Sequence, residues 1–262
     1  MVQDLRLLPS LEVVVEEALK IQLQWGGAIL HASIGVIALV FGQILPFSVG
    51  DKVRVAAYVG GAFMILDLLV RLPLYYWLVH GSDWKPRTSR LEAWFLFLED
   101  RLLIRTNILR EHERGVPATA VHFALGVLTP LSIGIPMWAV VPAVVIFGFG
   151  DPSARVVGKK FGGSVVWRGG TKRWTGMLGY FYVGSILGLM TVLLQSEFPL
   201  YPTGFSTSSL TISVILTAAV GAYFESLCEK DSSMFSKIVD DNFVVPFVGA
   251  VAFYAFVTAG TT

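Results

Sequence analysis

Long apolar segments separated by short polar ones dominate the pattern of this chain. A bilayer core needs about 20 apolar residues in a helix, and the pattern predicts seven spans. They lie at about 27–46, 53–72, 116–133, 136–150, 176–195, 207–227 and 243–259. We therefore expect an all-α protein, a polytopic helical bundle in a membrane.

Two further segments carry apolar side chains at helical spacing with charges opposite them. Residues 10–24 predict an amphipathic helix, and so does the apolar stripe within residues 91–102. We interpret the second as lying at the membrane interface. A helix packed in a soluble part is the alternative, but no other polar segment is long enough to cover it.

Composition supports a bilayer environment. Hydrophobic residues make up 54% of the 262 residues and charged residues only 15%, whereas soluble domains are about a quarter charged. Cys228 is the only cysteine, so there is no intrachain disulfide framework. We expect a single membrane domain, in which residues 1–115 precede a five-helix region at 116–262.

The basic residues predict an orientation. They gather in the polar segments 73–115, 151–174 and 228–242, whereas the other side of a seven-span bundle holds only Lys52 and Arg54. Positive charge marks cytoplasmic loops. The three basic segments and the N-terminus are therefore expected to face the cytoplasm.

The polar segment after the fourth span has the most unusual composition. Asp151 and Pro152 suit the N-cap and the first position of a helix. A helix starting there places Asp151, Arg155 and Lys159 on one face, and its free N–H groups suit a phosphate. The alternative is that Asp151 only caps a helix while the cations anchor to lipid headgroups. Six cations and several glycines in this segment favour a polyphosphate site.

Other carboxylates lie at the ends of later spans. Glu225 ends one span, and Asp241 and Asn242 open the next. Charged groups at membrane depth cost at least roughly 2.5 kcal/mol on insertion scales, which favours a functional role. Together with Asp151 they predict an oxygen shell for Mg²⁺. The sequence lacks the spacing of a P-loop, a dinucleotide fingerprint, a zinc site and a hydrolase elbow.

Three more polar residues interrupt the predicted spans. We interpret His122 as an interhelical hydrogen-bonding residue, and Asp67 as a partner of Arg71 one helical turn away. His31, near the start of the first span, is the stronger candidate for a functional role.

Residues 150–162, GDPSARVVGKKFG, are similar to a signature of membrane lipid kinases. The sequence resembles the superfamily of dolichol kinase, phytol kinase and CTP-dependent diacylglycerol kinase, whose signature reads Gly-Asp-x-x-Ala-x-x-x-Gly-x-x-Phe-Gly. Glu225-Ser226 and Asp241-Asn242 with Pro246 match two further elements. Lys172 to Gly176 stands where the family has Lys-Ser-x-Glu-Gly, with Arg173 and Thr175 departing from it. The likeness covers most of residues 110–255.

The resemblance implies a kinase that moves the γ-phosphoryl group of CTP to a lipid alcohol with Mg²⁺, at the cytoplasmic face. The alcohol could be a polyprenol such as dolichol, phytol, geranylgeraniol or a diacylglycerol, and ATP stays open as donor. We expect no nucleic-acid partner and leave a homo-oligomer open. A CDP-lipid synthase that uses a lipid phosphate is one alternative, and a transporter or receptor without enzymatic activity is another.

The resemblance also implies roles for individual residues. Asp151 and Asp241 would bind Mg²⁺, and Glu225 would position or deprotonate the lipid hydroxyl. His31 would contact the lipid. The residues expected to hold the nucleotide or support its site are Gly150, Arg155, Gly158, Lys159, Lys160, Lys172 and Asn242.

Overall fold

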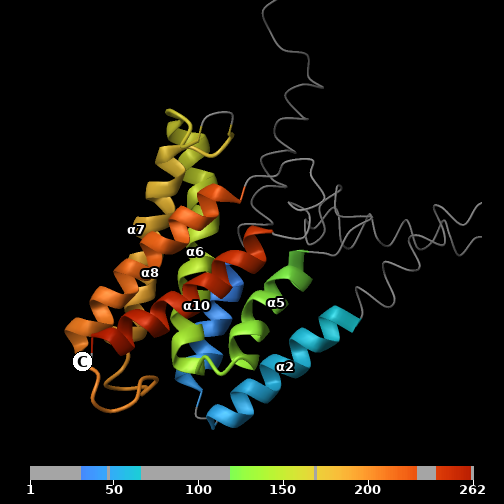
Figure 1. Ribbon diagram of the computed structural model, residues 1–262, viewed down its shortest axis with the longest axis vertical. Helices are drawn as coiled ribbons and strands as arrows, with labels where there is room; N and C mark the ends of the chain where they lie inside the picture. Colours follow the sequence, from blue (N-terminus) through green and yellow to red (C-terminus); the bar gives the residue numbers. More distant parts are fainter. Residues whose placement is uncertain (1–30, 46–47, 66–118, 168–169, 229–239, 261–262) are drawn as a thin grey trace, which may run out of the picture.

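The computed structural model describes residues 31–45, 48–65, 119–167, 170–228 and 240–260, all of them part of a helical bundle or its connections (Figure 1). These residues contain no β-strand, only an isolated antiparallel bridge between Val165 and Arg173. The predicted amphipathic helices, the Asp67–Arg71 pair and the polar segment 73–115 lie outside the described residues.

Each of the seven predicted spans contains a helix. The first is His31–Ile44, whose last five residues form the π-helix η2 (Val40–Ile44). The others are α2 (Val49–Ile65), α5 (Thr119–Ser132), α6 (Met137–Phe161), α7 (Trp174–Leu193), α8 (Thr207–Leu227) and α10 (Asp241–Ala259). Among the described residues, only α6, α7, α8 and α10 are long and apolar enough to cross a membrane. Four spans are therefore supported, and the expected seven are not confirmed.

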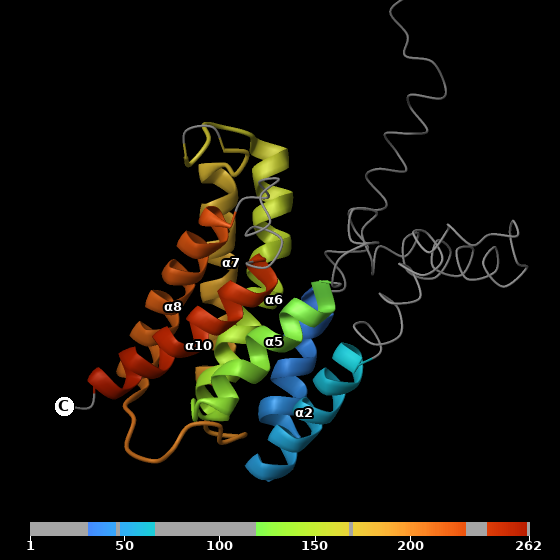
Figure 2. The same cartoon turned by 45° about the vertical axis from the view of Figure 1, so that its right-hand side comes forward.

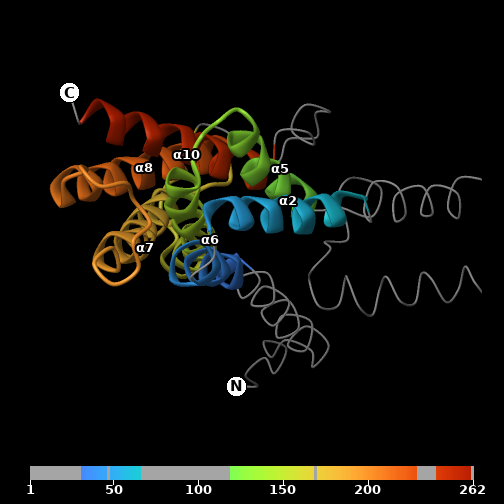
Figure 3. The same cartoon turned by 90° about the horizontal axis from the view of Figure 1, so that it is seen from below.

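Helix α6 lies at the centre of the bundle. Seen from below, α7, α8, α10 and α5 surround it (Figure 3), and it contacts all four as well as η2. Its first half is almost completely buried, from Met137 to Gly148. α6 therefore supplies the core around which the other helices place their side chains.

Helices α6 and α7 form a close antiparallel pair that extends beyond α8 and α10 (Figures 1 and 2). Small residues let the two backbones approach. A Cβ on Gly176 would lie 2.8 Å from the carbonyl oxygen of Ala154. The projecting end of this pair carries the basic residues of α6.

The helix start predicted at Asp151 and Pro152 is wrong. Both residues lie inside α6, which continues to Phe161. Apolar surroundings offer backbone groups no water to bind, so a helix there continues through a proline. Pro152 has no N–H to donate within the helix. Next to it, the Ser153 hydroxyl donates to the carbonyl of Phe149 (2.7 Å). No helix N-terminus therefore faces a phosphate at Asp151, and the connecting loop is shortened to residues 162–173.

Candidate metal and phosphate site

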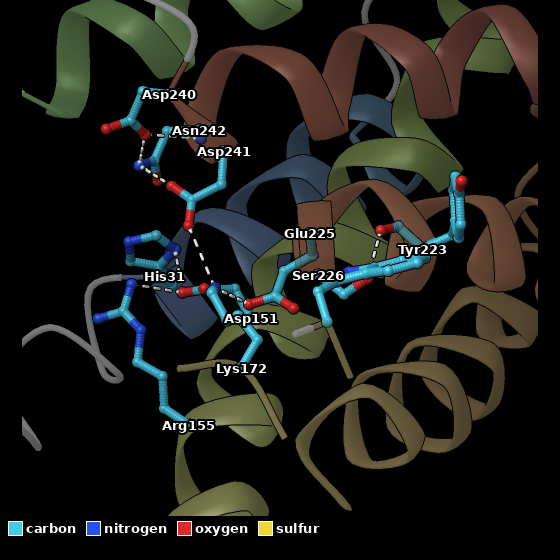
Figure 4. A network of polar contacts seen from close by, with 11 residues as sticks. His31, Asp151, Arg155, Lys172, Tyr223, Glu225, Ser226, Asp240, Asp241 and Asn242 are labelled. Atoms are coloured by element: carbon cyan, nitrogen blue, oxygen red, sulfur yellow. Dashed lines mark hydrogen bonds and ion pairs between the residues drawn. The ribbon is translucent and has the colours of Figure 1, made fainter. Parts of the chain in front are cut away.

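Three buried carboxylates from three helices meet at one point. Asp151 lies in the middle of α6, Glu225 in the last turn of α8, and Asp241 at the first position of α10. They offer one oxygen each, and these oxygens all lie within 4.8 Å of one another (Figure 4). Three like charges held this close in a buried place repel one another unless cations neutralise them.

Two side-chain cations contact this carboxylate cluster (Asp151, Glu225, Asp241). The Lys172 ammonium forms an ion pair with Glu225 and lies 3.7 Å from Oδ2 of Asp241. Arg155, one turn along α6, places Nη2 2.8 Å from Oδ2 of Asp151. Burial alone would lower the pKa of Lys172, but the charges of Glu225 and Asp241 outweigh it and raise that pKa. Lys172 is therefore held as a cation between two carboxylates.

His31 also reaches the cluster. Its Nδ1 lies 3.2 Å from Oδ2 of Asp151, and its ring packs on Phe147 with the centroids 5.4 Å apart. A close helix crossing sets this contact, because a Cβ on Gly148 would lie 2.6 Å from the backbone nitrogen of Gly35. The sequence predicted a lipid contact for His31, whereas the structure places it beside a candidate metal ligand.

Asn242 orients one of the carboxylates. Its Nδ2 donates to Oδ1 of Asp241 (2.8 Å) and also to Asp240. Asp240 is the N-cap of α10 and accepts from the backbone N–H of Asn242 (2.8 Å). Burial, followed by the charge of Asp241, raises the pKa of Asp240 to about 6. The prediction that Asp241 and Asn242 open this span is confirmed, since α10 begins at Asp241, and the amide of Asn242 fixes the Asp241 side chain.

A pocket of about 200 Å³ adjoins the cluster. It is lined by both ends of the α6–α7 connection together with one carboxylate from α8: Ala154, Arg155, Gly158, Lys159, Thr171, Lys172, Arg173, Gly176, Met177 and Glu225. Four of these side chains are basic. This basic pocket is therefore suited to an anion, and Glu225 joins it to the carboxylate cluster.

Two of the predicted nucleotide-binding residues lie away from this pocket. Lys160 is exposed and places Nζ 5.5 Å over the ring of Phe161. Gly150 packs against Tyr180, because a Cβ there would lie 2.8 Å from the tyrosine ring. Gly158 does line the pocket, and it also lets α6 approach Gly176.

A short hairpin between α6 and α7 brings Lys172 to the cluster. It begins at Gly162 and Gly163, where the chain leaves α6, and their φ angles of 64° and 99° favour glycine. The backbone N–H of Val166 donates to the carbonyl of Lys172 (2.9 Å). Trp167 on the same hairpin donates from Nε1 to the Ser226 hydroxyl (3.2 Å), next to Glu225. The hairpin is thereby attached to the end of α8.

Thr175, which stands where the lipid kinases have glutamate, faces the end of α6. Its hydroxyl donates to the carbonyl of Gly162 (2.5 Å), and the side chain is absent from the pocket lining. Thr175 therefore closes the C-terminal turn of α6. The basic side chains before it, Lys172 and Arg173, line the pocket instead.

The residues of the cluster fit a hard divalent cation. Mg²⁺ prefers carboxylate oxygens and commonly takes one or two of them with phosphate oxygens. Oδ1 of Asp151 has no hydrogen-bond donor in the part of the chain that the structure describes. A buried carboxylate oxygen in that position is an available ligand, so Asp151 and Asp241 can hold such an ion.

Sequence reasoning missed Tyr180. Its side chain is completely buried in α7, between the helices that carry Asp151 and Glu225. In the sequence it is one aromatic residue within an apolar span, and no pattern distinguishes it from the tyrosines nearby.

Comparisons of the chain with protein-family models, curated proteins and solved structures found no match.

Proposed function

We propose that the protein is a membrane lipid kinase that transfers the γ-phosphoryl group of a nucleoside triphosphate to a lipid alcohol. The resemblance in the sequence favours CTP as the donor. One observation carries the proposal: the carboxylate cluster meets Lys172 at the edge of the basic pocket. Phosphoryl transfer depends mainly on positioning and on neutralising oxygen charge, and these two groups of residues supply both.

The basic pocket is assigned to the phosphates of the donor. Arg155, Lys159, Lys172 and Arg173 line it, and their charges complement a polyphosphate. Its volume of about 200 Å³ is below the roughly 300–1,000 Å³ of sites that enclose a drug-sized ligand. We therefore assign the pocket to the phosphates of the donor and place its nucleobase outside the pocket.

The carboxylate cluster is assigned to Mg²⁺ and to the acceptor. Asp151 and Asp241 would hold the ion, with Arg155 and Asn242 fixing their orientation. Bound Mg²⁺ neutralises charge on phosphate oxygens. The buried position of these carboxylates in apolar helices supports a functional role, since charges in such places are costly.

Glu225 is assigned as the proton acceptor. It is ion-paired with Lys172, and a phosphate beside Lys172 competes with Glu225 for the ammonium. The carboxylate so released takes the proton of the lipid alcohol. The alcohol oxygen bonds to the γ-phosphorus, the bond from that phosphorus to the bridging oxygen breaks, and the nucleoside diphosphate leaves.

The lipid alcohol is expected to approach from the bilayer. Large apolar side chains are exposed along α7 and α8, among them Leu178, Ile186 and Ile212, and such surfaces suit acyl or isoprenoid chains. Glu225 lies at the end of α8, where α8 meets the basic hairpin. The hydroxyl can therefore reach the polar end of the bundle while its chain stays in lipid.

Transfer of label tests this proposal. Purified protein in lipid bilayers is incubated with Mg²⁺, γ-labelled CTP or ATP, and a panel of polyprenols, phytol, geranylgeraniol and diacylglycerol. The proposal expects label in a lipid phosphate with release of nucleoside diphosphate. Release of pyrophosphate from a lipid phosphate substrate would instead identify a cytidylyltransferase, and no nucleotide turnover with any lipid would contradict both reactions.

A further inference from the structure

Tyr180 is a completely buried side chain whose hydroxyl has no hydrogen-bond partner among the described residues. A buried hydroxyl left without a partner costs free energy, and such groups are rare in folded proteins. The other buried tyrosine of the described core, Tyr201, pairs its hydroxyl with that of Thr191 at 2.6 Å. The Tyr180 hydroxyl therefore needs an explanation that packing does not supply.

Two glycines hold this ring beside the carboxylate cluster. A Cβ on Gly150 would lie 2.8 Å from the ring, and a Cβ on Gly221 would lie 2.9 Å from the hydroxyl oxygen. Gly150 directly precedes Asp151, and Gly221 lies one helical turn before Glu225. The ring therefore lies against α6 next to Asp151, and the hydroxyl lies against α8 one helical turn before Glu225.

The charges around the hydroxyl point to the same place. Among the described residues, the carboxyl groups of Glu225, Asp151 and Asp241 lie close enough to act on it electrostatically. A phenylalanine would fill the same space without leaving a hydroxyl unpaired. The hydroxyl thus lies between the helices that carry Asp151 and Glu225, and it makes no hydrogen bond to the described residues.

We propose that the Tyr180 hydroxyl donates a hydrogen bond to the oxygen of the acceptor alcohol when that oxygen enters the carboxylate cluster. This inference rests on the proposed kinase function. Tyr180 keeps its own proton, and the proton of the alcohol goes to Glu225. The hydrogen bond holds the alcohol oxygen at the inner end of the cluster, so Tyr180 selects and positions the acceptor and does not act on the donor.

The test compares Tyr180→Phe with Tyr201→Phe in the full chain, purified in lipid bilayers. Five quantities are measured: kcat and KM for the lipid alcohol, KM for the nucleotide, affinity for Mn²⁺ by electron paramagnetic resonance, and Tm. For Tyr180→Phe we expect kcat/KM for the alcohol to fall about tenfold, as for one lost hydrogen bond. Its nucleotide KM, Mn²⁺ affinity and Tm should match wild type or, for Tm, exceed it.

Tyr201→Phe should behave in the opposite way. It removes a paired hydroxyl remote from the cluster, so Tm should fall while the kinetic constants stay unchanged. An unchanged kcat/KM for the alcohol in Tyr180→Phe would overturn the inference and leave the kinase proposal intact. So would a change confined to nucleotide KM, or a loss of activity that follows a lower Tm. Absence of transfer by wild type would instead overturn the kinase proposal and the role of Tyr180 with it.

Discussion

Gly148 of α6 and Gly35 of the first helix touch through their backbones. A Cβ on Gly148 would lie 2.6 Å from the nitrogen and 2.7 Å from the Cα of Gly35. One turn away from this crossing, His31 lies against Asp151. A contact between two residues without side chains therefore sets the position of a polar pair at the carboxylate cluster.

Gly148→Ala should separate these two helices. The obstructing atoms belong to backbone and cannot rotate away, so we expect the free energy of unfolding to fall by about 1–3 kcal/mol, as for other overpacked cores. Activity should fall as well, because His31 moves away from Asp151. Gly61→Ala is the matched control, since a Cβ there meets nothing within 4 Å. Thermal unfolding of both variants measures the difference, and equal Tm values would contradict this description of the crossing.

The positions of the helices could be predicted from hydropathy, but the end of α6 could not. Gly150, Asp151 and Pro152 have the composition of a helix start in water, where Pro at the first position leaves no N–H unpaired. Inside an apolar bundle, breaking the helix exposes several backbone groups that nothing satisfies. The helix therefore runs through Pro152, and Asp151 becomes a buried side chain in its interior.

The three carboxylates of the cluster were predicted from the sequence as a metal site, but the side chains that contact them from other helices were not. Glu225 and Asp241 were singled out because charge is costly in apolar helices, and Asp151 because it opens a segment rich in glycines and cations. Sequence spacing within one helix cannot show that His31 meets Asp151, since the contact joins two helices through a glycine crossing. Tyr180 had no signal, because burial of a hydroxyl without a partner becomes visible only when the neighbouring helices are in place.

Lys172→Met should damage both stability and activity. It leaves Glu225 and Asp241 without their shared cation. We expect a loss of about 3 kcal/mol of stability, at the lower end for a broken buried ion pair because Lys172 keeps some exposure to solvent. Phosphoryl transfer should fall at least tenfold through loss of phosphate contact. Lys160→Met is the control, because it removes a cation outside the pocket. If Lys160→Met lost as much transfer activity as Lys172→Met, the assignment of Lys172 and not Lys160 to the phosphates would be wrong.

Divalent cations should stabilise the protein through the carboxylate cluster. At a concentration one hundred times its dissociation constant, Mg²⁺ or Mn²⁺ is expected to add about 2.7 kcal/mol to the free energy of unfolding. Asp241→Asn should remove most of that gain while Glu197→Gln, at an exposed position before α8, keeps it. Tm recorded with and without the ion, after chelation, gives the measurement. An equal gain in all three proteins would place the ion elsewhere.

Transfer of the labelled γ-phosphoryl group by wild type, Asp151→Asn and Asp51→Asn, compared in parallel in the same bilayers with Mg²⁺, tests the central claim most directly. Asp151 is buried in the cluster, whereas Asp51 is an exposed residue at the start of α2. The proposed site predicts label in lipid with wild type and Asp51→Asn, and loss of transfer with a correctly folded Asp151→Asn. Full transfer by Asp151→Asn would contradict it.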